Sequence, residues 1–135
     1  MNPKSNINLS EVIINCGKVF LRPDDIICID LKEDYCVEME DMRNINSAIE
    51  KVAMGCKRAV LTIGGKYTTF SQDALRDSVN PQNFTYTLAD AFVIKSIHQR
   101  LLAHFYIKVK CPPVPTRYFE KPEEAIAWLL TYKKK

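Results

Sequence analysis

The 135-residue sequence has no long apolar run. No segment reaches the roughly 18 consecutive apolar residues that a membrane-spanning helix requires. The polar start, MNPKSNINLSE, also lacks the apolar core of a signal peptide. From these two absences we expect no membrane partner.

Clustered metal ligands are also absent. The five cysteines are odd in number, are scattered, and form no CxxC pair: Cys16, Cys28, Cys36, Cys56 and Cys111. A zinc site needs clustered Cys or His, whereas His98 and His104 lie near no cysteine and do not share a helical face. We therefore expect no metal, and free thiols that are buried or half-buried in a reducing compartment.

The sequence has little net charge and no catalytic motif. Its formal charge is +3, and the Lys133-Lys134-Lys135 tail can account for it, so nucleic-acid binding is not indicated. No Ser–His–Asp or Cys–His set can be assembled from the order of the residues. Gly64-Gly65-Lys66 does not have the longer frame of a Walker motif. We therefore expect a protein that is not an enzyme and that uses no cofactor.

What is present suits a single globular domain. The hydrophobic share of 47% and the charged share of 26% are sufficient to close one core at this length. Residues 1–10 are rich in Asn and Ser and contain Pro3, which predicts a flexible N-terminal tail. The domain itself is then predicted to span residues 11–132.

The segment 58–76 is predicted to hold the central strand, the loop after it and the start of the next helix. Its unbroken apolar run, residues 59–63, is typical of a parallel strand that is buried on both faces. Ser71 is a plausible N-cap for the helix that follows. Open α/β sheets place functional groups in the loop after such a strand. The candidate binding or switch loop therefore comprises Gly64, Gly65, Lys66, Tyr67, Thr68, Thr69 and Ser71.

Strand and helix patterns alternate along the rest of the chain. Residues 11–21 read as strand material with a turn or bulge at Gly17, and residues 26–31 as a second strand that pairs with it in an antiparallel manner. A helix over 38–54 ends near Gly55, which suits a left-handed cap. Later come a strand at 88–94, a helix after Ser96, an edge strand at 116–119 and a helix from Pro122. The order ββαβαβαβα predicts an α/β fold with a mixed, mostly parallel sheet.

Asp90 and the helix after Ser96 each lead to a prediction about burial. Asp90 interrupts an apolar strand, and either it is solvated at the strand start, which we favour, or it pairs with another group in the fold. The helix after Ser96 is predicted to bury a stripe of mainly apolar residues: Ile97, Leu101, Ala103, His104 and Phe105.

This layout resembles the STAS domain, the fold of bacterial anti-sigma-factor antagonists, over roughly residues 18–131. The C-terminal third also resembles small STAS-like proteins of Bacteroidetes, often of unknown function, through shared positions at Pro115, Phe119, Glu123, Glu124, Ala125, Trp128 and Leu129. The resemblance implies a STAS-like fold and a non-enzymatic, cytoplasmic regulatory or binding module that is sometimes dimeric. Partner-switching antagonists carry a phosphorylatable Ser or Thr after the central strand, in an Asp-Ser-Ser-Gly-like motif. The loop here offers Thr68, Thr69 and Ser71 without that motif.

Several interpretations stay open. Gly64-Gly65 forms either a tight turn that needs glycine backbone angles, which we favour, or a phosphate cradle. Ser71 is a cap, a phosphosite or both. The leading function is regulatory: interaction with an unidentified protein partner, with partner-switching and a homodimer as options. The alternative is a carrier or sensor of a small molecule, lipid or anion in the cleft between sheet and helices. A packed interior without a pocket near Gly64 and Ile94 would count against that alternative. A third hypothesis is an enzyme that uses Lys66 or Tyr67.

Overall fold

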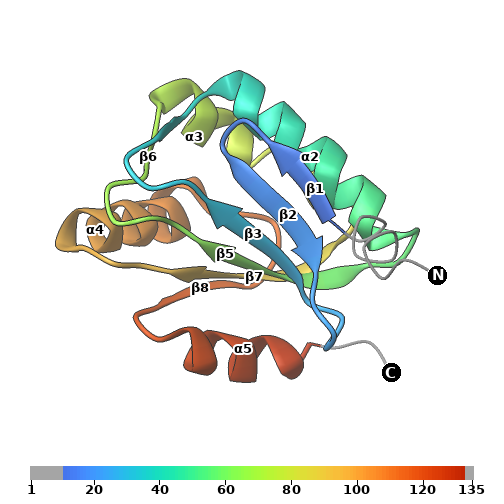
Figure 1. The fold of residues 1–135 in the computed structure, drawn as a ribbon. Coiled ribbons are helices and arrows are strands. Elements are labelled where there is room, and N and C mark those ends of the chain that lie inside the picture. Colours follow the sequence, from blue (N-terminus) through green and yellow to red (C-terminus); the bar gives the residue numbers. More distant parts are fainter. Residues whose placement is uncertain (1–10, 133–135) are drawn as a thin grey trace.

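The computed structural model describes residues 11–132; the predicted flexible tail at 1–10 and the lysine tail at 133–135 lie outside the described residues. A six-stranded sheet in the order β1-β2-β3-β5-β7-β8 carries helices on both faces (Figure 1). Its strands are β1 (Glu11–Ile14), β2 (Gly17–Leu21), β3 (Ile27–Leu31), β5 (Arg58–Ile63), β7 (Thr87–Val93) and β8 (Thr116–Phe119). The helices are α2 (Met39–Ala53), α3 (Gln72–Ser78), α4 (Ile97–Phe105) and α5 (Pro122–Leu130), with a 3-10 turn η1 (Pro81–Phe84) and a π-helix η2 (Tyr106–Lys110).

The first three strands form an antiparallel meander. The structure divides the predicted strand material at 11–21 into β1 and β2, so three strands rather than two form the antiparallel part of the six-stranded sheet. Gly17 opens β2 with a φ of 154°, and a Cβ at this position would lie 2.0 Å from the carbonyl oxygen of Asp30. The turn therefore depends on glycine, because any side chain would collide with the neighbouring strand.

The other half of the sheet is parallel. β3, β5, β7 and β8 run in the same direction, and α2, α3 and α4 lie in the crossovers between them. Alternate side chains of β5 enter two separate cores: Val60 packs on the side of α2, whereas Ala59 and Leu61 pack on the side of α5. The predicted central strand, buried on both faces, and the mixed, mostly parallel sheet are both confirmed.

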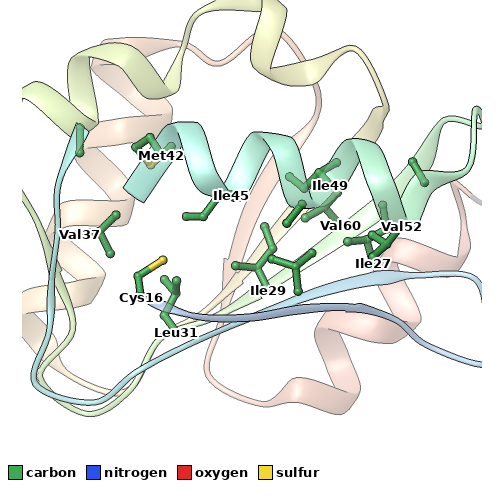
Figure 2. Close-up of a cluster of buried hydrophobic side chains, with 14 residues drawn as sticks. Cys16, Ile27, Ile29, Leu31, Val37, Met42, Ile45, Ile49, Val52 and Val60 are labelled. Carbon is green, nitrogen blue, oxygen red and sulfur yellow. The ribbon is translucent and has the colours of Figure 1, made fainter. Parts of the chain in front are cut away.

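Helix α2 covers the antiparallel half of the sheet. Met42, Ile45 and Ile49 point from it toward strand side chains such as Ile29 and Leu31 (Figure 2). Asp41 is buried in the first turn, where its carboxylate accepts hydrogen bonds from the backbone N–H of Glu38 (2.9 Å) and from Tyr35 Oη (3.0 Å). The predicted cap at Gly55 has a positive φ of 79°, and the preceding Met54 is left-handed as well, with a φ of 52°.

Helix α5 covers the opposite face of the sheet (Figure 1). Ala125 and Leu129 are fully buried there against the small side chains Ala89 and Ala91 of β7. Pro122 is the first residue of the helix, as predicted, since its fixed φ suits the first turn.

The buried face of α4 differs from the prediction. Ala103 is buried as expected, but Ile97, Leu101, His104 and Phe105 are exposed, and the buried polar residue Gln99 takes their place. The spacing of the apolar residues is that of a core-facing stripe. The tertiary contacts nevertheless select the other side of the helix, where a small alanine allows close approach and the Gln99 amide is fully hydrogen-bonded. The prediction of a buried stripe was therefore wrong.

Candidate functional site

A cavity of about 140 Å³ lies on the α2 side of the sheet. Its floor consists of side chains from the three central strands: Ile29, Val60, Thr62, Asp90 and Phe92. Its walls come from α2, α3, η1, α4 and η2, and include Met42, Ile45, Ile49, Leu75, Phe84, Leu102, Ala103 and Tyr106. Mostly apolar walls with a few polar groups are the usual composition of a ligand pocket. This cavity is the candidate functional site.

Strand alternation determines which residues reach the cavity. Successive side chains of a strand point to opposite faces of the sheet. In β7, Asp90 and Phe92 line the cavity, whereas Ala89 and Ala91 pack in the core beneath α5. One strand thus supplies a close-packed surface on one face and a polar group on the other.

Asp90 is the acidic group of the cavity. It lies in the middle of β7, partly buried, and its Oδ1 accepts a hydrogen bond from Thr62 Oγ1 at 3.2 Å. Desolvation raises its pKa from 3.8 to about 7, and the hydrogen bond from Thr62 opposes that rise. The interpretation we favoured, a solvated residue at the strand start, was wrong, and the pairing interpretation is confirmed.

The other polar groups at the cavity are bonded to the protein itself. Asn46 Nδ2 donates to Asn83 Oδ1 at 2.5 Å, which ties α2 to η1. Tyr106 Oη donates to the carbonyl oxygen of Ser78 at 3.4 Å. Burial raises the pKa of the Tyr106 phenol well above its usual range, and the nearby Asp90 adds to this effect. These contacts hold the walls in place.

The predicted loop closes one end of the cavity. Gly64 and Thr68 line it, together with Phe70 and Ile94. The Thr68 hydroxyl is buried, donates to the carbonyl oxygen of Lys32 and accepts from the backbone N–H of Gly65 at 2.7 Å. That N–H therefore points inward, to Thr68, rather than outward to an anion.

Gly65 is needed for space rather than for an unusual backbone angle, whereas a Cβ on Gly64 would make only ordinary contacts, at 3.6 Å or more. Neither Gly64 nor Gly65 has a positive φ, which corrects our explanation of the turn. A Cβ on Gly65 would lie 2.3 Å from the Cα atom of Glu33, so only glycine allows these two segments to meet.

The remaining loop residues face outward or hold the backbone. Lys66 and Tyr67 are exposed, with Lys66 Nζ 5.3 Å from the centre of the Tyr67 ring. Thr69 belongs to β6 (Thr69–Phe70), which pairs in parallel with β4 (Cys36–Val37). Ser71 caps α3, as predicted, because its Oγ accepts from the backbone N–H of Ala74 at 3.1 Å. Whether Thr68, Thr69 or Ser71 is phosphorylated stays a prediction.

Gln99 joins this loop to α4, a role the sequence did not reveal. Its Nε2 donates to the carbonyl oxygens of Gly65 (2.7 Å) and Thr68 (3.2 Å), and its Oε1 accepts from the backbone N–H of Lys95 at 2.7 Å. A buried amide is tolerated only when it is bonded in this way. Since these partners come from another part of the chain, no local pattern indicates them.

No group of three or more His, Cys, Asp or Glu side chains among residues 11–132 is arranged to hold a metal ion, and no helix in that range is long and apolar enough to cross a membrane. The five cysteines are free. Cys16 and Cys28 are buried, which raises the pKa of each thiol to about 11. Cys36, Cys56 and Cys111 are exposed, contrary to our expectation of buried or half-buried thiols.

Comparison with known proteins identifies the family. A family model described as a domain of unknown function, DUF7793, matches residues 19–133, and the chain belongs to this family. A search of the curated proteins finds no match. A solved structure of an uncharacterized protein of the DUF3478 family, with a SpoIIAA-like fold, from Shewanella loihica PV-4, is similar to this chain with a TM-score of 0.59. The identity is 16%, over 89% of this chain and 94% of that one.

At this identity the likeness shows the fold alone. The SpoIIAA-like fold is STAS-like, so the STAS-like α/β architecture predicted from the order of elements is confirmed.

Proposed function

We propose that this member of the DUF7793 family is a non-enzymatic, cytoplasmic STAS-type module that binds a small, largely apolar molecule between its sheet and helices. The cavity carries this proposal: it measures about 140 Å³ and is bordered by Gly64 and Ile94, where a ligand site was expected. An apolar protein cavity of about 150 Å³ accepts benzene. A ligand of roughly six to ten non-hydrogen atoms therefore matches the space.

The residues at the cavity favour binding over turnover. Covalent catalysis needs an activated nucleophile, and proton transfer needs a positioned acid or base. Among the cavity-lining residues that the structure describes there is no Cys, His or Lys, and the hydroxyl of Thr68 is engaged with Lys32 and Gly65. Asp90 is the acid present, and it accepts a hydrogen bond from the Thr62 hydroxyl. Among the described residues that line the cavity, no His, Lys or Cys stands beside this pair to complete a catalytic set.

The position of the cavity suits a sensor. Its walls include Thr68 of the loop and Ala103 of α4, and both elements also present exposed side chains, such as Tyr67 and Leu101. A ligand that shifts these elements changes the outer surface as well. Binding inside can therefore alter what a partner protein meets outside.

The first test is native mass spectrometry of the protein purified from its own host, which detects a retained ligand directly. A second test is NMR titration of the purified chain with toluene. We expect shifts at cavity residues of β5, β7 and α4, and we expect Ala103→Leu, which fills the space, to abolish them. The matched control is Ala127→Leu, the same change at an exposed position of α5. Toluene that leaves the spectra of the folded protein unchanged would contradict the proposal.

A specific observation favours protein interaction as a second function. The outer face of α4 and η2 carries an apolar row at four-residue spacing: Ile97, Leu101, Phe105 and Val109 are 77%, 65%, 45% and 60% exposed. The exposed side chains of Arg100, His104 and Lys108 form a basic row beside it, and Arg100 also makes an ion pair with Glu120. Apolar surface of this kind marks interaction sites.

The charges indicate which partner fits. We propose a partner protein whose own apolar row is flanked by Asp or Glu, because its acidic groups would meet the basic row of α4. A second copy of this chain would instead bring Arg100 and Lys108 against like charges. A homodimer through this face is therefore disfavoured.

Designed peptides test this second function. An amphipathic helical peptide with leucines beside glutamates should bind the wild type, whereas the same peptide with lysines should not. Leu101→Asp should abolish binding, and Lys108→Glu should reverse the preference. If sedimentation instead shows a wild-type dimer that Leu101→Asp dissociates, the occupant is a second copy and the acidic-partner proposal fails.

A further inference from the structure

The cavity holds one carboxyl group and no cation to match it. Asp90 is the acidic residue at its surface, and among residues 11–132 no Lys, Arg or His lines it. Thr62 Oγ1 donates to Asp90 Oδ1, one of the two carboxyl oxygens. A carboxylate has about four lone-pair sites, so the group retains capacity for a further donor.

We propose that the ligand of this cavity carries an ammonium group, and that Asp90 binds it while the apolar walls enclose the rest of the molecule. This inference rests on the proposed ligand-binding function and specifies the ligand class: a small primary or secondary amine with an apolar body. An isolated charge inside a protein is unfavourable unless it is paired and hydrogen-bonded. A bound ammonium would supply both the opposite charge and the missing donors.

The groups facing Asp90 agree with a cationic ligand. Thr62 donates to it from β5, Tyr106 of η2 interacts with it electrostatically, and Asn46 and Asn83 line the same cavity from α2 and η1. Of these, only Tyr106 is titratable, and its pKa is raised well above the usual range, so it stays neutral. Among residues 11–132, no Lys, Arg or His side chain lines the cavity to compete for the carboxylate.

A pair of aromatic rings is the second feature of the cavity that favours a cationic ligand. The Phe92 and Tyr106 rings line the cavity, with centres 5.6 Å apart and planes at 61°. Aromatic rings attract ammonium groups through their negative faces, and more strongly where water is excluded. Both rings also offer apolar area to the body of the ligand.

The test uses three compounds of similar shape: benzylamine, benzyl alcohol and toluene. Binding is followed by NMR titration at pH 8, where Asp90 is ionised in the free protein because its pKa is about 7. We expect benzylamine to bind about tenfold tighter than benzyl alcohol or toluene, or better, because a hydrogen bond to a charged group is formed. Asp90→Asn should remove this advantage and leave toluene binding unchanged.

The pH dependence of the wild type is a second measurement that needs no variant. Affinity for benzylamine should fall as the pH drops from 8 to 6, because Asp90 takes up a proton and loses its charge. Affinity for toluene should change little over this range. The Asp90→Asn protein, if folded, should show no such dependence for either compound.

The outcomes separate this inference from the function on which it rests. If all three compounds bind equally well and Asp90→Asn changes nothing, the amine inference is overturned and the binding function stands. If none binds to the folded wild type, both fail. If phenylacetate binds more tightly than benzylamine, and increasingly so at lower pH, Asp90 shares a proton with an acidic ligand and the amine inference is overturned.

Discussion

The two faces of the sheet are filled in different ways. Beneath α5, small side chains allow the helix to lie close: Ala59, Ala89 and Ala91 meet Ala125 and the fully buried Leu129. Above the same strands, larger side chains from the helices meet Thr62 and Asp90 and leave a cavity of about 140 Å³. We call the face beneath α5 the closed face, which stabilises the fold. We call the face that bears the cavity the open face, which offers a site.

The position of α2 accounts for this difference. It packs mainly on β1, β2 and β3, the antiparallel half of the sheet, and on α3. The parallel strands β5 and β7 are covered on that side by residues of η1, α4 and η2 instead. Short elements and helix ends fill space less completely than one long helix face, so the cavity lies over β5 and β7.

Truncating one leucine on each face of the sheet should give the largest difference in the free energy of unfolding. Leu129→Ala removes a fully buried side chain from the closed face, and we expect a loss of about 3–5 kcal/mol in the free energy of unfolding. Leu102→Ala removes a partly buried side chain that already borders the cavity, and we expect about 1–2 kcal/mol. Urea denaturation measures both.

Equal losses at the two positions would contradict the comparison, since they would mean that both faces are packed alike. A larger loss of unfolding free energy for Leu102→Ala than for Leu129→Ala would mean that the open face is the more tightly packed of the two.

Asp90 should make the stability of the open face depend on pH. Its pKa is about 7 in the folded protein against 3.8 ordinarily, so the folded state binds a proton more readily between these values. The free energy of unfolding therefore falls as the pH rises from about 4 to about 7. Asp90→Asn removes this fall, and its stability relative to the wild type should be about 2–4 kcal/mol greater at pH 8 than at pH 4.

Chemical denaturation of both proteins across this pH range measures the effect. Other carboxylates titrate in both proteins alike, so the difference between the two isolates Asp90. A constant difference between them would show that Asp90 is not desolvated in the cavity.

Local signals in the sequence account for much of the fold. The apolar run at 59–63 identified the central strand, and Ser71 and Ser96 identified helix starts, because capping depends on residues close in sequence. The exposed face of α4 was mispredicted because Ile97 and Leu101 repeat like core residues. Their exposure is decided by what packs on the helix, which the local pattern does not contain.

The site was only partly predictable for the same reason. Gly64 and Ile94 marked its place, since loops at the carboxyl ends of parallel strands share one edge. Asp90 stood out in its apolar strand, yet its partner Thr62 lies on another strand and is not indicated locally. The half-buried Asn46 and the buried Gln99 were missed because their amides bond to partners distant in sequence.

Enlarging one alanine on each face tests the same difference in packing by adding volume instead of removing it. Ala91→Leu adds volume to the close-packed face beneath α5 and should cost about 1–3 kcal/mol. Ala103→Leu adds the same atoms beside the cavity and should change the free energy of unfolding by less than about 1 kcal/mol. Thermal denaturation compares the two, and a greater loss at Ala103 would show that the cavity is not available for filling.

The smallest expected effect concerns the hydrogen bond at the cavity floor. Thr62→Val removes the hydroxyl that donates to Asp90 Oδ1 and so removes the contact that holds the Asp90 pKa down. The pKa should rise above about 7, and the free energy of unfolding at pH 8 should fall by about 1 kcal/mol, because the charged carboxylate loses a donor. Thr62→Ser keeps the hydroxyl and is the matched control. NMR titration of the Asp90 carboxyl follows the pKa directly. If the Asp90 pKa is the same in all three proteins, water rather than Thr62 solvates the carboxylate, and the open face is wetter than its apolar walls indicate.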